Sequence, residues 1–320
     1  MRRLVALLFA FMLVAAACGS DDEGSAESDA PTGAPEKADI KLGIIPIADL
    51  APVFIGIEQG FFADEGLTVA TEFAQGGAAA IPAVISGDID FAFGAYPSFF
   101  SAVQEGLPLL IATEANRAAP LFGGLYSMPD SGIESPADMA GSTVAVNTLN
   151  NLVQLAVEAQ LVDAGLSLDD ITLVEIPFPD MVATLERGDV DVISVVEPFG
   201  TIARNSLNAT LVTDMFAGRI ADFPVAGFYV TESFAEANPN TVAAFNRAFA
   251  KAVDYANTTP DAVPEILPTY TSATLESAKT LNYPLFVAGI DAGVIQEVPD
   301  FMAEAGLLDA SIPVSEHVIN

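Results

Sequence analysis

The stretches Ile85–Phe91, ISGDIDF, and Leu185–Val192, LERGDVDV, follow one pattern. Each passes from the end of a helix through a glycine and an aspartate into a strand. Glycine accepts the left-handed backbone that ends a helix, and aspartate stabilises the turn into the strand. Because the two copies lie far apart in the chain and have similar flanks, they indicate two lobes built from the same unit rather than a solenoid of short repeats.

Strand and helix patterns alternate around these two stretches. The clearest helices are residues 152–162, with a buried stripe that extends to Val162, and residues 239–257, for which Asn238 is the predicted cap. This alternation predicts an α/β fold with largely parallel sheets. The predicted strands are residues 39–46, 67–73, 89–93, 109–113, 143–146, 171–176, 190–195 and 209–212.

The chain opens with the basic pair Arg2-Arg3, an apolar run and three alanines, and Cys18 follows directly. This order is typical of a secretory signal peptide over residues 1–17. The position of Cys18 resembles a bacterial lipobox and predicts a lipid on that thiol, although Ala15 stands where the pattern usually has leucine. The alternative is an ordinary signal peptide with an incidental cysteine. Residues 18–37 contain no large apolar side chain, which predicts a disordered linker before a body that begins near Ala38.

The chain is strongly acidic, with 43 Asp and Glu against 11 Lys and Arg and a formal net charge of −32. Such a surface repels phosphate backbones, which argues against nucleic-acid binding. It also repels anionic lipid headgroups, so we expect membrane contact to depend on the lipid at Cys18. No later stretch is apolar for long enough to span a bilayer.

Ligands of parallel sheets gather beyond the carboxyl ends of the strands. Three segments are expected there: residues 94–98, 147–151 and 196–199. The donors of residues 147–151 are suited to a polar or anionic ligand group, with plain helix capping as the alternative. The candidate ligand-binding residues in the three segments are Tyr96, Ser98, Thr148, Asn150, Asn151, Glu197 and Phe199.

Residues 56–67, GIEQGFFADEGL, read as a helix end followed by a turn into a strand. They also resemble the substrate-binding proteins of importers for nitrate, for taurine and other sulfonates, and for thiamine-pyrimidine precursors. Further matches follow in the same order at residues 86–92, 132–146, 188–191 and 197–198. The resemblance extends from about Ile40 to Ala256.

The resemblance implies a type II periplasmic-binding-protein fold, with two lobes, two crossover segments and a central ligand cleft. The crossovers are expected near residues 125–127 and 227–229. Lobe 1 would then consist of residues 38–126 and 229–320, and lobe 2 of residues 127–228. Ligand binding would close the lobes by a hinge motion that a transporter can recognise.

The ligand class follows from the charges and rings expected in the cleft. Nitrate or a sulfonate requires facing donors or positive charge, for which Arg117, next to the candidate Asn116, is the best basic residue, although a solvent-facing arginine is the simpler interpretation. Asp49 and Glu197 favour amino groups or ring N–H donors on the ligand instead. Stacking surface is expected from Tyr96, Phe199, Phe228 and Tyr229. We therefore expect a small organic ligand, such as a pyrimidine-like heteroaromatic compound, with nitrate or a sulfonate as the alternative.

Other function classes are less well supported. One relative of this fold makes the thiamine pyrimidine with its own histidine and a cysteine-rich stretch, but here the one histidine is His317 and no cysteine follows Cys18. No nucleophile–base pair and no metal cluster is recognisable, so we expect neither an enzyme nor a cofactor or metal. We expect a monomeric receptor that is anchored to the outer face of the cell membrane. Its expected partners are an importer permease and the ATPase of that permease. A lipoprotein sensor that signals to a membrane receptor is the second alternative.

Overall fold

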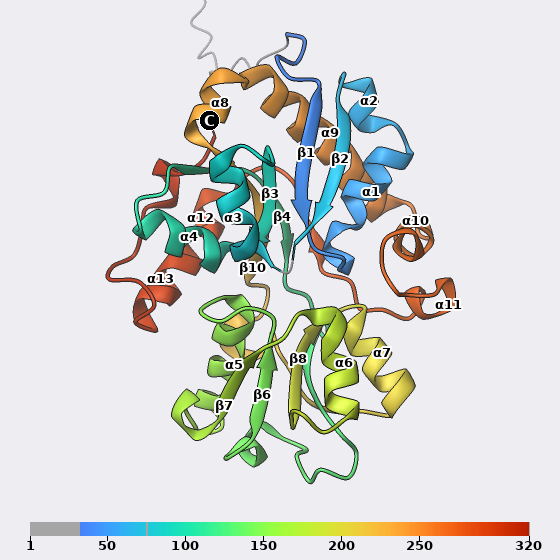
Figure 1. The fold of residues 1–320 in the computed structure, drawn as a ribbon, viewed down its shortest axis with the longest axis vertical. Coiled ribbons are helices and arrows are strands. Elements are labelled where there is room, and N and C mark those ends of the chain that lie inside the picture. Colours follow the sequence, from blue (N-terminus) through green and yellow to red (C-terminus); the bar gives the residue numbers. More distant parts are fainter. Residues whose placement is uncertain (1–32, 75, 320) are drawn as a thin grey trace, which may run out of the picture. The chain divides into compact units, whose positions relative to one another are not determined.

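The structure, a computed structural model, describes residues 33–74 and 76–319. The predicted signal peptide, Cys18 and most of the predicted linker therefore lie outside the described residues. Within the described part, the strands form one sheet of six and one of five, and helices cover both sheets (Figure 1). The predicted α/β class is confirmed, but the sheets are mixed rather than largely parallel, since five of the nine strand pairings in the described part are antiparallel.

The first sheet has the strand order β11-β4-β10-β3-β1-β2. Its strands β1, β2 and β3 run parallel, whereas β10 runs antiparallel to both of its neighbours. Strands covered by helices on both faces are apolar along their whole length, as in the fully buried β10. The strands are β1 (Asp39–Ile44), β2 (Thr68–Phe73), β3 (Phe91–Ala95), β4 (Leu109–Arg117), β10 (Pro224–Thr231) and β11 (Leu285–Phe286).

The second sheet has the strand order β7-β6-β8-β5-β9, with β6, β7 and β8 parallel and β5 antiparallel to its neighbours. Gly87 and Gly188, the glycines of the two similar stretches, have φ of 79° and 72° and lead into β3 and β8. The shared turn pattern thus enters one strand of each sheet, as predicted. The strands are β5 (Gly123–Ser127), β6 (Thr143–Val146), β7 (Thr172–Glu175), β8 (Val192–Val196) and β9 (Thr210–Asp214).

The chain passes between the sheets earlier than predicted at both crossovers. Residues 125–127 lie inside β5 of the second sheet, and residues 227–229 lie inside β10 of the first sheet. The connections are instead residues 118–122, between β4 and β5, and residues 215–223, between β9 and β10. The crossovers implied by the resemblance are therefore displaced by a few residues, because residues 125–127 and 227–229 pair with neighbouring strands on both sides.

The helices lie on both faces of each sheet (Figure 1). Val162, predicted to be buried in the stripe of α5, is half exposed, because that end of the helix borders a surface groove. The helices are α1 (Ala51–Glu58), α2 (Phe61–Asp64), α3 (Gly77–Ser86), α4 (Tyr96–Gln104), α5 (Leu152–Asp163), α6 (Phe178–Glu186), α7 (Phe199–Leu207), α8 (Glu232–Ala237), α9 (Pro239–Thr258), α10 (Ala262–Ile266), α11 (Leu275–Ala278), α12 (Ala292–Ile295) and α13 (Glu297–Glu304).

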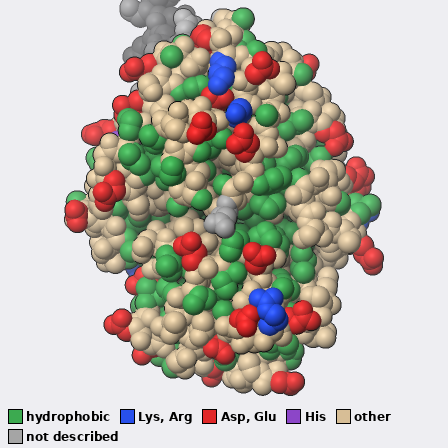
Figure 2. Space-filling view, in the orientation of Figure 1, with side chains coloured by type: hydrophobic (Ala, Val, Ile, Leu, Met, Phe, Trp, Pro, Cys, Tyr) green, Lys and Arg blue, Asp and Glu red, His purple; other side chains and the backbone are tan. Residues whose placement is uncertain are grey.

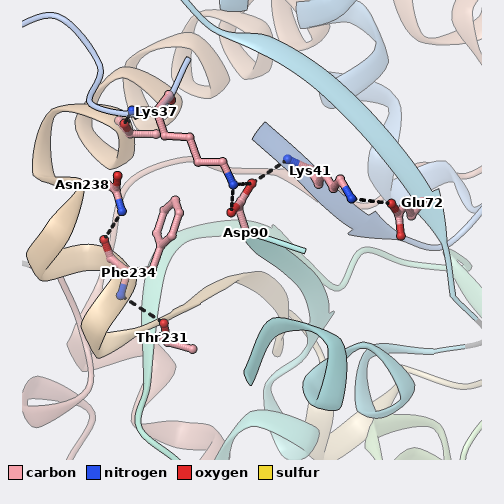
Figure 3. A network of polar contacts seen from close by, with 8 residues as sticks. Lys37, Lys41, Glu72, Asp90, Thr231, Phe234 and Asn238 are labelled. Carbon is pink, nitrogen blue, oxygen red and sulfur yellow. Dashed lines mark hydrogen bonds and ion pairs between the residues drawn. The ribbon is translucent and has the colours of Figure 1, made fainter. Parts of the chain in front are cut away.

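The body begins before Ala38. Glu36 accepts hydrogen bonds from the backbone N–H groups of Asn240 and Thr241, at 3.1 and 2.9 Å, and so caps the first turn of α9. Asn238, the predicted cap, instead donates its side-chain amide to the Phe234 carbonyl at the end of α8. Lys37 pairs with Asp90 (Figure 3). The last residues of the predicted linker are therefore ordered, because α9 and Asp90 offer them specific polar partners.

Acidic side chains are spread over the face drawn in Figure 2, where Lys and Arg are few. This distribution agrees with the net charge and with the argument against nucleic-acid binding. Among residues 33–74 and 76–319, none of the helices combines the length and the apolar character that crossing a bilayer requires.

Candidate functional site

A small cavity lies where the carboxyl ends of strands from both sheets meet. Its volume is about 40 Å³, which is space for a few water molecules. Most of its lining is apolar, with one carboxyl and two amide side chains. The lining residues are Ile45, Ile47, Asp49, Gly77, Phe93, Ala95, Asn147, Asn151, Leu152, Val153, Phe178, Val196, Phe216, Val225 and Ala226.

Strand ends and helix starts place these side chains. The cavity receives residues that follow β1, end β3, follow β6 and end β8, and it receives the first residues of α3, α5 and α6. The close approach of α3 to β3 requires two glycines, since a Cβ on Gly77 would lie 2.5 Å from the Cα of Gly94. The parallel-strand rule that predicted the location therefore describes this cavity.

Asp49 is the one ionisable side chain among the lining residues. It is 3% exposed, and its Oδ1 accepts a hydrogen bond from the Asn116 side-chain amide at 2.7 Å. Its Oδ2 is buried and has no hydrogen-bond partner among the described residues. Desolvation raises the pKa of Asp49 to about 7, and hydrogen bonds from its own backbone N–H and from Asn116 oppose this rise. Asp49 can therefore be an acceptor or a donor near neutral pH.

Two amides complete the polar lining. Asn151 caps α5, because its side-chain oxygen accepts the N–H of Leu152 at 2.8 Å. The side-chain oxygen of Asn147 is buried and has no partner among the described residues. The capping interpretation thus holds for Asn151, while Asn147 offers a ligand a free acceptor.

The aromatic lining comes from Phe93, Phe178 and Phe216. Phe178 stacks on Phe199, with ring centroids 6.1 Å apart and planes inclined by 18°. The candidate Phe199 therefore supports a ring of the cavity wall without being part of that wall.

Three aromatic candidates belong to the core beneath the cavity. Phe228 packs between Phe245 and Phe249, with centroids 5.2 Å from each. Tyr229 is 1% exposed and donates its hydroxyl to the Gly94 carbonyl. Tyr96 is fully buried, and its hydroxyl has no hydrogen-bond partner among the described residues. None of the three is among the lining residues, and neither is the buried Ser98.

Glu197 is turned away from the cavity. Its carboxylate accepts from Thr201 at 2.9 Å (backbone) and 2.8 Å (hydroxyl) and from Arg204 at 3.2 Å. Desolvation raises its pKa despite these bonds. Its backbone carbonyl accepts the N–H of Ala48, next to Asp49, at 3.0 Å. Glu197 thus joins the two sheets through its backbone and holds the start of α7 through its side chain.

The remaining candidates lie at the rim or away from it. Thr148 is partly buried beside the backbone of Gly76, and Asn150 is exposed with φ of 54°. Arg117 pairs with the buried Glu114 at 2.7 Å, and its environment raises its pKa, chiefly through that hydrogen bond. The lining includes neither lysine nor arginine. No group of three or more potential metal ligands occurs in the part of the chain that the structure describes.

Residues 147–151 were expected at the site, but the Asn147 side chain was not among the candidates, and Phe178 was missed altogether. Asn147 directly follows β6, and Phe178 begins the helix after β7. Both obey the same strand-end rule that selected Asn151, so a stricter use of that rule would have found them. No sequence signal shows that Asn116 reaches Asp49, because the two side chains come from different parts of the chain.

Comparisons with known proteins agree with this architecture. A family model described as "NMT1/THI5 like" matches residues 47–263, well over half of the chain. The nitrate/nitrite binding protein NrtA of Nostoc sp. is 27% identical over 243 residues, which are 68% of this chain and 53% of that protein. The chain thus spans about half the length of this relative. The formylaminopyrimidine-binding protein of Halalkalibacterium halodurans is 24% identical over 292 residues, which are 88% of this chain and 81% of that protein.

A solved structure is similar over almost the whole described body. The alkanesulfonate-binding protein SsuA from Xanthomonas axonopodis pv. citri, bound to MOPS, has a TM-score of 0.78 at 16% identity. The match covers 89% of this chain and 99% of that chain. At this identity the similarity concerns the fold alone, and the predicted periplasmic-binding-protein fold is confirmed.

Proposed function

The chain belongs to the NMT1/THI5-like family, and from this premise we propose that it is an extracytoplasmic solute-binding protein of an ABC importer. It captures a small organic molecule between its two lobes. The observation that carries this proposal is the cavity itself, to which both sheets contribute side chains. In this arrangement the volume of about 40 Å³ suits only a few waters, so a larger ligand enters when the lobes separate and is enclosed when they close.

The lining favours an uncharged ligand that carries N–H donors. Asp49 and Asn147 each present a buried oxygen without a partner among the described residues. Phe93 and Phe178 supply apolar surface for a ring, and no basic side chain is among the lining residues. A pyrimidine-like heteroaromatic compound combines a flat ring with such donors. Asn151 lines the cavity, and the partly buried Thr148 and the exposed Asn150, at the same end of α5, are assigned to its rim.

Nitrate or a sulfonate is the second candidate ligand class. It is favoured by one observation, the convergence of the first residues of α3 and α5 on the cavity, since helix N-termini attract anions. A neutral Asp49 would then donate to the anion, which is compatible with its raised pKa. The two ligand classes therefore require opposite protonation states of Asp49.

We assign binding rather than catalysis to this cavity. Its polar side chains are a carboxyl and two amides, which suit hydrogen bonding to a ligand, and Asp49 Oδ2 and Asn147 Oδ1 have no partner among the described residues. The family relatives described above carry the word "binding" in their names.

The partners follow from the proposed role. Residues before the described body would carry the lipid on Cys18, which holds the monomeric receptor at the outer face of the cell membrane. An importer permease with its ATPase would accept the ligand from the closed lobes. A sensor that presents the same closed lobes to a membrane receptor is the alternative, and an importer operon beside the gene would favour transport.

The test is a thermal-shift screen of the full chain with pyrimidines, flavins, sulfonates, nitrate and amines. A ligand at one hundred times its dissociation constant stabilises the protein by about 2.7 kcal/mol. We expect shifts with amino-bearing heterocycles and not with oxyanions. A screen in which oxyanions alone raise the midpoint would overturn the ligand class while leaving the binding role intact. Asp49→Leu is the matched variant, because it removes the polar group from the cavity and is expected to abolish the shift.

A further inference from the structure

Asn116 is hydrogen-bonded to a residue of the cavity wall without being part of that wall. It lies on β4, is fully buried and is not among the lining residues. Its side-chain amide donates to Asp49 Oδ1 at 2.7 Å, although Asp49 lies in the loop after β1. Asn116 therefore acts on the cavity through another side chain.

The direction of this bond decides which oxygen of Asp49 is free. An amide N–H can only donate, so Oδ1 of Asp49 is an acceptor whether the carboxyl is ionised or neutral. Oδ2 has no partner among the described residues. Any proton on Asp49 therefore belongs on Oδ2, and that oxygen is the one that changes between acceptor and donor.

The surrounding groups leave Oδ2 free. Tyr270 is the titratable group that interacts with Asp49 from the segment before α11. Its hydroxyl donates to the Ile47 carbonyl at 3.1 Å, and its ring stacks on Phe54 at 3.9 Å between centroids. Because that proton is already engaged, Tyr270 does not satisfy Oδ2.

The other charged groups nearby have partners of their own. Across the sheet boundary, the Glu197 carboxylate is bound by Thr201 and Arg204. On β4, Glu114 is bound by Arg117. Among the described residues, Asn116 is therefore the side chain that donates a hydrogen bond to Asp49.

We propose that Asn116 is a positioning residue for Asp49, which it holds by Oδ1 so that Oδ2 accepts an N–H of the ligand. This inference rests on the proposed function, since it concerns the same site and an N–H-bearing ligand. Asn116 also favours the ionised carboxyl, because a donated hydrogen bond stabilises the charged form. Burial raises the pKa of Asp49 to about 7 against hydrogen bonds from its own backbone N–H and from Asn116, so the loss of the Asn116 donor moves its titration to higher pH.

The test compares Asn116→Leu, which removes the donor at similar volume, with Asn246→Leu. Asn246 is a matched control, since its amide also makes one bond, to the Ala112 carbonyl at 2.8 Å, and its oxygen is also buried without a partner among the described residues. The first readout uses the full chain without ligand and follows its unfolding by urea between pH 5 and pH 9. We expect the pH at which stability stops falling to lie near 7 in the wild type and in Asn246→Leu, and higher in Asn116→Leu.

The second readout is calorimetric titration with 4-aminopyrimidine between pH 6.5 and pH 9. The wild-type affinity should rise as pH rises through about 7, as Asp49 ionises. For Asn116→Leu we expect an affinity about tenfold lower at pH 7, the usual cost of one hydrogen bond, and a midpoint at higher pH. Asn116→Ser keeps a hydroxyl donor, so its affinity and its pH midpoint should lie between those of the wild type and of Asn116→Leu. It replaces the leucine variant in both readouts if that variant does not fold.

The two readouts separate the possible failures. An unchanged pH profile of stability in both Asn116 variants would overturn the positioning role, whatever the probe does. A shifted profile without binding of 4-aminopyrimidine would support the positioning role and contradict the proposed ligand class. Nitrate binding that weakens as pH rises would show that the neutral, donating form of Asp49 binds the ligand. That result would also overturn the inference.

Discussion

Lys37 is paired with Asp90 at the start of the first sheet. The Lys37 Nζ lies 2.6 Å from Asp90 Oδ1, and the same carboxylate accepts the backbone N–H of Lys41 at 2.9 Å (Figure 3). Asp90 is 4% exposed, whereas Lys37 is 43% exposed. One buried carboxylate thus ties the segment before β1 both to β1 and to the turn before β3.

Asp90→Ala should destabilise the protein. It removes the ion pair with Lys37 and the acceptor of the part-buried Lys41 N–H, which together cost about 1–3 kcal/mol. Unfolding by urea measures this loss. The matched control is Glu72→Ala, because Glu72 pairs with Lys41 at 3.6 Å and both side chains are more than half exposed, so its loss should be within about 0.5 kcal/mol. Equal effects of the two variants would contradict the assigned role of Asp90.

Gly77→Ala should disturb the wall of the cavity. A Cβ at Gly77 would meet the Cα of Gly94 at 2.5 Å, a backbone atom that cannot rotate away. We expect a loss of about 1–3 kcal/mol, as for other overpacked sites, together with weaker ligand binding. Circular dichroism melting and the thermal-shift screen measure the two effects. Gly293→Ala is the control, since its Cβ would meet only Asp291 Oδ1 at 3.4 Å, and wild-type behaviour of Gly77→Ala would show that α3 can move.

Glu197→Gln should separate stability from ligand binding. The carboxylate is 1% exposed and holds Thr201 and Arg204, so the neutral amide should cost about 1–3 kcal/mol. The dissociation constant of the ligand should stay within about twofold, because the side chain does not line the cavity. Asp189→Asn, at an exposed pair with Arg187, is the control for stability. A large loss of affinity in Glu197→Gln would show that the Glu197 side chain contributes to ligand binding.

Asp49→Asn should make the stability of the ligand-free protein less dependent on pH. The pKa of Asp49 is raised by desolvation from 3.8 to about 7 in the folded state. Between these values the folded state binds a proton that the unfolded state has lost, so stability falls as pH rises and levels off above about 7. The asparagine variant does not titrate, so it should be more stable than the wild type by about 4 kcal/mol at pH 8 and by little below pH 4. Urea titrations at pH 4, 6 and 8 check this, and a constant difference across them would refute the titration of Asp49.

The regular strands were predictable because their pattern is local. The predicted strand at residues 143–146 has the bounds of β6, and both Gly-Asp turns lead into strands. The crossovers were not predictable from the same pattern. Whether residues 123–127 and 224–231 are connections or strands depends on the pairing partners that distant parts of the chain provide.

The site was predictable in location and less so in membership. Asp49 and Asn151 do line the cavity, and the strand-end rule selected their neighbourhood. Tyr96, Phe228 and Tyr229 have the side chains expected of a stacking site, but a buried aromatic ring has the same sequence signature in a core. Their neighbours in the folded chain put them in the core.

The sequence by itself determined the alternation of strands and helices, the two related turns, the acidic charge and the family, because these depend on composition and on residues near one another in the chain. Only the tertiary structure decided that Asp49 is held by Asn116 and that Glu36 caps α9. The physical reason is that a cavity, its protonation state and its orphaned oxygens are made by side chains from distant segments. Burial and hydrogen bonding among such segments exist only once both sheets are assembled.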